Sequence, residues 1–138
     1  MENSILLLSL FIVFIFGVFF SIALKGKAKN TKWKLKVSQK LTELEAMSKS
    51  SDTIHLKNVV TETDKLLDYV LKMNSIKGET LGERLMSATK HYEWNEYQKI
   101  WEAHKIRNKI AHELDFSPSA PTLESSYKTL KQAIKKWL

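Results

Sequence analysis

Three polar residues near the end of one predicted helix have the side chains that acid–base chemistry needs. Arg107, Asn108 and His112 occur in the stretch WEAHKIRNKIAHEL, residues 101–114. A cation and an amide can hold a phosphate group while an imidazole transfers a proton, and together these groups can break a phosphodiester by general acid–base catalysis. The stretch is therefore compatible with a catalytic site for phosphodiester cleavage.

The helix that must position these residues sorts its side chains onto two faces. At about 100° per residue, one narrow arc collects the charged residues Glu102, Lys105, Lys109 and Glu113. The opposite arc, which we predict to face a core, carries Tyr97, Ile100, Ala111 and Leu114 together with the polar residues His104, Arg107 and Asn108. An arginine there needs a partner, because desolvating an unpaired guanidinium is costly. A carboxylate of this fold, a symmetry mate or a phosphate could each serve.

Metal binding and nucleophilic catalysis have little support in the sequence. His104 and His112 are eight residues apart, about 12 Å along a helix, which is too far to share one ion. The HExxH pattern is absent, and so are cysteine and a GxSxG elbow. We therefore predict no metal site and no cofactor.

Length and charge indicate one domain with an appendage. The chain has 138 residues, 43% of them hydrophobic, and a net charge of +7. Six of those charges lie in one short run, at Lys25, Lys27, Lys29, Lys32, Lys34 and Lys36. From residue 37 onward 16 basic residues stand against 14 acidic ones, a balance of +2. Charge alone therefore does not predict RNA binding by the folded part.

The N-terminal region is typical of a membrane anchor. Ile5 to Leu24 is an apolar run of 20 residues, and about 20 are needed to span a bilayer as a helix. We therefore predict a transmembrane signal-anchor helix in residues 1–24, followed by a lysine-rich juxtamembrane segment, 25–36, against anionic lipid headgroups. By the positive-inside rule the chain is a single-pass protein of the inner (plasma) membrane, with its N-terminus outside and residues 37–138 in the cytoplasm.

The remaining chain predicts helices only. Helical spacing or capping signals indicate helices at about 33–47, 54–73, 80–90, 95–114 and 121–137, and no run alternates like a strand. The expected fold is all-α, an N-terminal transmembrane helix followed by a four- to five-helix antiparallel bundle in residues 37–138. Whether the membrane helix continues into the helix from Trp33 to Met47 is left open.

The segments DKLLDYVL, GETLGERL and IWEAHKIRNKIAHE resemble small bacterial proteins of the HEPN superfamily, some of which carry an N-terminal membrane anchor. Within them RNKIAH, residues 107–112, looks like the R-N-x(3)-H form of the superfamily motif, and the likeness covers roughly residues 56–138. The resemblance implies a helical bundle that pairs as a homodimer and, in active families, a metal-independent endoribonuclease used in stress or defence. By position, Arg107 would hold the scissile phosphate, Asn108 would orient the groups and His112 would transfer a proton.

A non-catalytic interpretation explains the same residues. Arg107 could pair with Asp64 of the preceding long helix, and Asn108 and His104 could complete a buried hydrogen-bond network that fixes helix packing or a dimer interface. The protein would then be an interaction or dimerisation domain that recruits an unknown protein partner to the membrane. The sequence leaves open whether the chain is an enzyme, and whether it binds RNA or a nucleotide.

Overall fold

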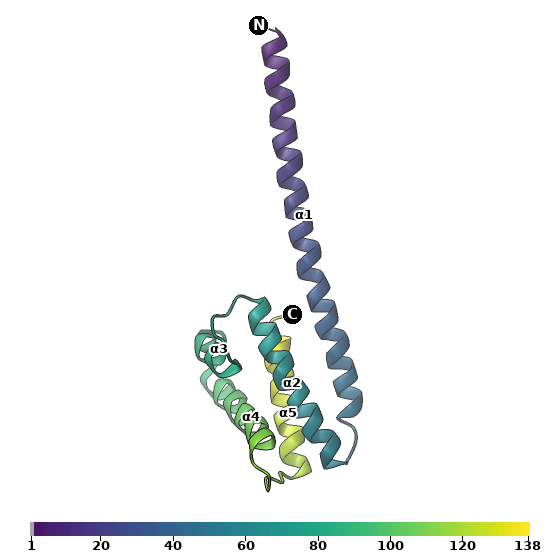
Figure 1. Cartoon of the computed structure of the whole chain (residues 1–138), viewed down its shortest axis with the longest axis vertical. Coiled ribbons are helices and arrows are strands. Elements are labelled where there is room, and N and C mark those ends of the chain that lie inside the picture. Colours follow the sequence, from purple (N-terminus) through teal and green to yellow (C-terminus); the bar gives the residue numbers. More distant parts are fainter. Residues whose placement is uncertain (1) are drawn as a thin grey trace. The chain divides into compact units, whose positions relative to one another are not determined.

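The protein is all-helical in the region that its structure describes (Figure 1). The structure, a computed structural model, describes the backbone of residues 2–138 and the side chains of residues 7, 8, 10–22 and 32–138. The helices are α1 (Glu2–Met47), α2 (Thr53–Met73), α3 (Leu81–Ser87), the 3-10 helix η1 (Thr89–His91), α4 (Trp94–His112) and α5 (Ala120–Lys135). Because no strand occurs in the described backbone, the all-α prediction is confirmed.

The chain divides into two compact units, residues 1–36 and residues 37–138. Helix α1 begins in the first unit and ends in the second, so the predicted N-terminal helix and the predicted helix from Trp33 to Met47 belong to one assigned helix. The predicted functions of these segments, as anchor and cytoplasmic domain, stay predictions.

The prediction of a transmembrane helix is wrong for the residues that the structure describes. No helix among them is long and apolar enough to cross a bilayer. The side chains of 25–31, most of the predicted juxtamembrane segment, lie outside the described residues. The membrane location and the lipid contacts stay predictions.

Residues 37–138 form a helical bundle, as predicted. Helix α5 packs against both α2 and α4, while α2 also contacts α3 and α4. Figure 1 shows α4 and α5 running in opposite directions around the short connection that joins them. The largest fully buried side chains come from every long helix and are Val37, Leu44, Leu56, Val59, Val60, Leu67, Leu71, Leu85, Ile100, Leu123, Leu130 and Ile134. Burying this apolar surface is the main stabilising term of the bundle.

Helix starts follow the capping residues of the sequence. The Asp52 side chain accepts a hydrogen bond from the amide of Ile54, 2.9 Å away, at the start of α2. Thr80 accepts from the amide of Glu83 at 3.3 Å, and the Glu83 carboxylate accepts from the amide of Glu79 at 2.7 Å. The Glu83 side chain thus reaches one residue further back than in a standard capping box. The helix predicted from there to about residue 90 is divided into α3 and η1.

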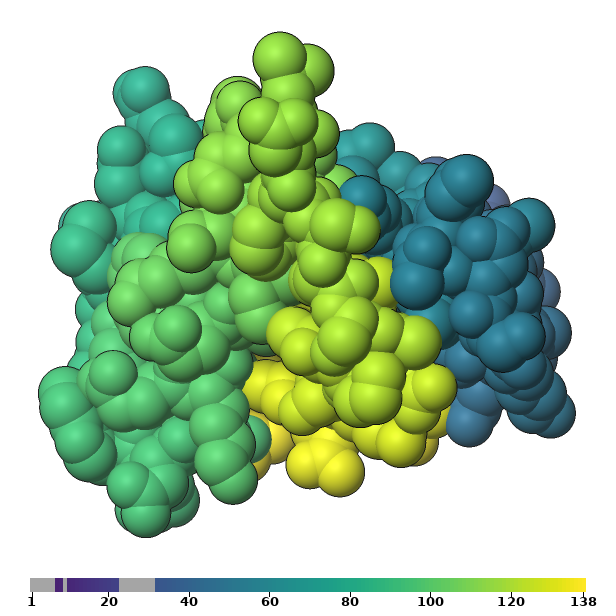
Figure 2. Space-filling view, turned by 90° about the horizontal axis from the view of Figure 1, so that it is seen from below, coloured from purple at the N-terminus to yellow at the C-terminus, as the bar shows by residue number. Residues whose placement is uncertain are grey.

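Helix α4 carries the candidate site, and it ends earlier than predicted. Tyr97 and Ile100 are buried as expected, but Ala111 and Leu114 are exposed, so their prediction as core residues is wrong. The reason is that α4 ends at His112 and the chain then leaves the bundle. Figure 2 shows the lime-green segment between α4 and α5 standing out from the body of the domain. The helical spacing of apolar residues continues to Leu114 in the sequence, but none of the described helices packs over the Leu114 side chain.

Candidate functional site

Asp64 is a buried carboxylate on the core face of α2. It follows the buried residues Val59 and Val60 by roughly one helical turn, and the Asp64 residue is only 3% exposed. An ionised carboxylate is seldom buried to this degree unless other groups pair with it. Its partners come from α4, which packs against α2.

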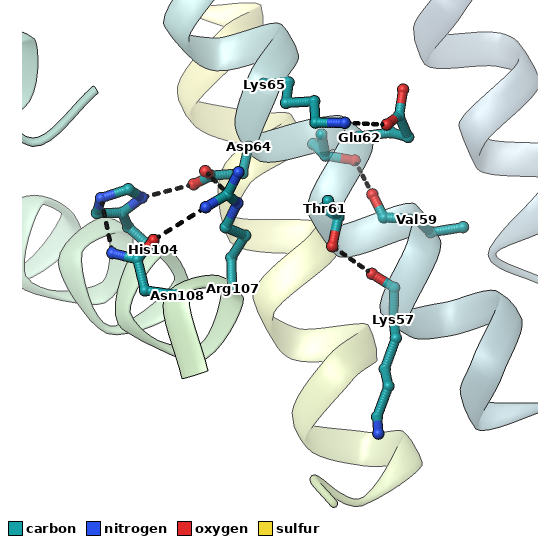
Figure 3. Close-up of polar contacts among 10 residues, drawn as sticks. Lys57, Val59, Thr61, Glu62, Asp64, Lys65, His104, Arg107 and Asn108 are labelled. Atoms are coloured by element: carbon teal, nitrogen blue, oxygen red, sulfur yellow. Dashed lines mark hydrogen bonds and ion pairs between the residues drawn. The ribbon is translucent and has the colours of Figure 1, made fainter. Parts of the chain in front are cut away.

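Four side chains from α2 and α4 form a closed ring, drawn in Figure 3. His104 Nδ1 lies 2.9 Å from Asp64 Oδ1. The other imidazole nitrogen, Nε2, lies 3.2 Å from the amide nitrogen of Asn108. Arg107 Nη1 donates to Asn108 Oδ1 over 3.1 Å. Arg107 Nε closes the ring 3.3 Å from Asp64 Oδ2.

The ring has only one consistent arrangement of protons. A guanidinium can only donate hydrogen bonds, so the Asn108 atom that faces Arg107 must be the oxygen. The Asn108 NH2 group therefore faces His104 Nε2, and that nitrogen must be an unprotonated acceptor. The imidazole proton then sits on Nδ1 and is donated to Asp64. The geometry thus requires a neutral His104 in the Nδ1–H tautomer, in a cluster whose Asp64 and Arg107 charges cancel.

Arg107 is the member of the ring whose hydrogen-bonding capacity is least used. Its side chain is 24% exposed, whereas that of Asp64 is 4% exposed. The buried Nε–H of Arg107 lies within ion-pairing distance of Asp64 but has no acceptor in hydrogen-bond geometry. A buried donor without an acceptor is costly. The guanidinium therefore retains unused donor capacity and partial access to solvent.

Trp101 packs against His104, a contact that the sequence analysis missed. Its ring meets the imidazole edge-on, with centroids 5.8 Å apart and planes at 70°. The Trp101 ring also lies near Gly82 in α3, where an added Cβ would be 3.5 Å from the indole. Only its place one turn before His104 could have indicated this contact, because residues three apart on a helix are neighbours.

The structure brings together four of the five predicted site residues. Asp64, His104, Arg107 and Asn108 meet in the ring, which is the network expected under the non-catalytic interpretation. His112 is exposed in the last turn of α4 and takes part in no hydrogen bond or ion pair found among the described side chains. Because residues four apart on a helix are neighbours, His112 lies one turn beyond Asn108. Its imidazole is therefore open to a ligand or a second molecule.

The larger hollows of the domain lie elsewhere. Two open grooves of about 640 and 630 Å³ run between α4 and α5 and share the lining residues Lys99, Pro121, Ser125 and Thr129. None of the predicted site residues lines either groove. The lining of these grooves offers no constellation for chemistry. The ring and the neighbouring His112 are the stronger candidate because their groups are arranged for hydrogen bonding and proton transfer.

Within the described side chains no group of three or more histidine, cysteine or acidic residues is placed to hold a metal ion. Comparison with known proteins adds no identity, since no family model, curated protein or solved structure matches this chain.

Proposed function

We propose that residues 37–138 form a HEPN-like domain that works as a homodimer and cleaves RNA without a metal ion. The observation that carries this proposal is the combination of a partly exposed, pre-oriented Arg107 and Asn108 with an exposed, unbonded His112 one turn away. The resemblance of RNKIAH to the superfamily motif supplies the substrate class. The second copy would supply the rest of the cleft.

The expected reaction is transfer of the phosphodiester to the 2′-hydroxyl of the same nucleotide. His112 accepts the 2′-hydroxyl proton while the 2′-oxygen bonds to phosphorus and the bond to the 5′-oxygen breaks. The 5′-oxygen takes a proton from solvent water as it leaves, and the product carries a 2′,3′-cyclic phosphate. Arg107 offsets the negative charge that develops on the phosphoryl oxygens, and Asn108 keeps the guanidinium in place.

The ring gives Asp64 and His104 a positioning role in this scheme. Asp64 fixes the tautomer of His104, which accepts from the Asn108 amide and so orients Asn108 Oδ1 toward Arg107. The ring therefore controls the position of the Arg107 guanidinium.

The test is cleavage of a mixed RNA pool by the purified full chain with EDTA present. We expect products with 2′,3′-cyclic phosphate ends, and we expect His112→Ala to abolish them. His55→Ala is the matched control, since His55 is also an exposed histidine, with its side chain 59% exposed, and it lies outside the ring. Sedimentation of the same samples reports whether the chain is dimeric. A folded dimer that leaves RNA intact would refute the ribonuclease proposal.

A second candidate function is a non-enzymatic domain that binds a partner protein. Two observations favour it: Asp64 already neutralises Arg107 inside the fold, and Leu114 is fully exposed beside the site. A partner that covers this side chain would remove its apolar surface from water, which favours binding. In that case Leu114→Lys would remove capture of the partner, while His112→Ala would leave it unchanged.

A further inference from the structure

The ring that holds Arg107 is compatible with only one charge state of His104. Protonated imidazole has two N–H donors and no acceptor. One of them can still donate to Asp64, but the other would face the NH2 group of Asn108, 3.2 Å away. Two donors pointing at each other repel, so protonation of His104 breaks this contact in its present form.

Rotation of the Asn108 amide by 180° would resolve the conflict and create another. The Asn108 oxygen would then accept from His104 Nε2–H, and its NH2 group would face Arg107 Nη1. The guanidinium would lose its acceptor in the ring, in addition to the Nε–H that already lacks one. The cluster would also change from net zero to +1, with two cations sharing the Asp64 carboxylate.

No other described carboxylate is placed to absorb that charge. From α2, Asp64 is the acidic group that contacts His104, while Asp68 pairs with Arg84 of α3 at 2.6 Å. On the side of α3, Gly82 lies near Trp101, and Trp101 packs against the imidazole, so this contact brings no charged group to His104. From α4 itself the charged neighbour is Arg107, and among the described side chains no ion pair joins α5 to His104. An anion from solution is therefore the natural partner of the opened cluster.

We propose that His104 is a proton-controlled latch on Arg107. Neutral His104 holds the guanidinium against Asn108, and protonated His104 releases it to bind a phosphate group. The inference rests on the proposed function in one respect, that the anion Arg107 takes is a phosphodiester. The coupling of His104 to Asn108 and Arg107 stands without that assumption.

The coupling is tested first, by NMR spectroscopy of the ¹⁵N-labelled full chain between pH 8 and pH 5. The imidazole nitrogens of His104 should show the Nδ1–H tautomer at pH 8, and the Asn108 NH2 and Arg107 guanidinium signals should shift in step with protonation of His104. Asn74 is the internal control, because its NH2 group donates to the carbonyl of Val70 and touches no histidine. Asn108 and Arg107 signals that stay fixed while His104 protonates would overturn the latch.

Anion binding is tested next with dimethyl phosphate, which remains a monoanion across this pH range. The His112→Gln variant serves as background, so that the exposed imidazole cannot contribute to the pH dependence. We expect about tenfold tighter binding at pH 5.5 than at pH 8, as one added charge at close range produces. Asn108→Ala in that background should reduce the ratio between the two pH values, because protonation of His104 then no longer reaches Arg107 through the Asn108 amide.

Equal affinity at both pH values in the His112→Gln background would refute the proposal. These outcomes are separable from failure of the ribonuclease assignment. A chain that leaves RNA intact can still show the coupled signals and pH-dependent binding of dimethyl phosphate. A chain that cleaves RNA without them has the proposed function and no latch.

Discussion

Replacing Asp64 by asparagine tests whether the ring stabilises the fold. The substitution keeps the size of the side chain and removes its charge. An asparagine oxygen can still accept from His104, but the NH2 group would then face Arg107 Nε where Asp64 Oδ2 now lies, 3.3 Å away. Two donors would be opposed, and Arg107 would lose its counter-ion.

The magnitude follows from the exposure of each partner. Removing one member of a fully buried ion pair costs about 3 to 5 kcal/mol. Here the Arg107 side chain is 24% exposed and can turn partly to water, which reduces that cost. Weakening the charge-assisted hydrogen bond to His104 adds about 1 kcal/mol. We expect a loss of about 3 kcal/mol in the free energy of unfolding, or roughly 14 °C in melting temperature for a domain of this size.

The assay is urea unfolding of the full chain at pH 7, followed by circular dichroism. Glu62→Gln on the same helix is the control, because Glu62 pairs with Lys65 at the surface and such pairs contribute about 0.5 kcal/mol or less. Adding Arg107→Met to Asp64→Asn should restore part of the lost stability, because it removes the unpaired cation. A loss below about 1 kcal/mol for Asp64→Asn, or one equal to that of the control, would refute the reasoning.

Three further predictions follow from single residues. Gly78→Ala should destabilise the fold by about 2 kcal/mol or more, because Gly78 has φ +143° and a Cβ there would lie 2.7 Å from the Arg84 amide nitrogen. The control is Gly82→Ala, whose Cβ would meet only ordinary contacts and which should unfold at nearly the wild-type urea concentration. Burial raises the pKa of Tyr92 to about 12, so its hydroxyl should leave the free energy of unfolding unaffected below pH 10. Between pH 10 and 12 that free energy should fall by about 2 to 3 kcal/mol, because the tyrosine ionises in the unfolded chain but not in the folded one. A Tyr92→Phe variant that loses as much stability over this range would contradict the prediction. The backbone amide of Ile54 and the His55 side chain, which both bond Asp52, lower the pKa of its carboxyl, so the stabilisation it provides is present at pH 7 and decreases as pH falls below about 4. Asp52→Ala should therefore lower the melting temperature more at pH 7 than at pH 2, and an equal loss at both would contradict this.

The sequence predicts the helices because their signals are local. The spacing of buried residues in α2 and the caps at Asp52 and Thr80 involve residues a few positions apart. The meeting of Asp64 with Arg107 was also predictable as an option, because a buried guanidinium requires an acceptor. The choice of a carboxylate over a phosphate or a second copy required the packing of α2 against α4.

Two features depend on packing that periodicity cannot supply. Leu114 continues the apolar stripe of α4, yet it is exposed because the bundle ends before it. Trp101 lies near both Gly82 and His104, which are distant in the sequence, and a seven-residue helix such as α3 leaves only a faint pattern in the sequence. The closure of the ring likewise depends on side-chain directions rather than spacing.

The exposed end of α4 places Arg107 and His112 on parts of the helix with different local stability. Arg107 belongs to a turn that the ring ties to α2, whereas Ala111 and His112 are exposed in the last turn. Helix ends with few buried contacts open at little free-energy cost, independently of global unfolding. Backbone amides of this last turn should therefore exchange with solvent much faster than those around His104. Any ligand or partner copy that engages both residues must first order that turn, so part of its binding energy is spent on lost conformational entropy.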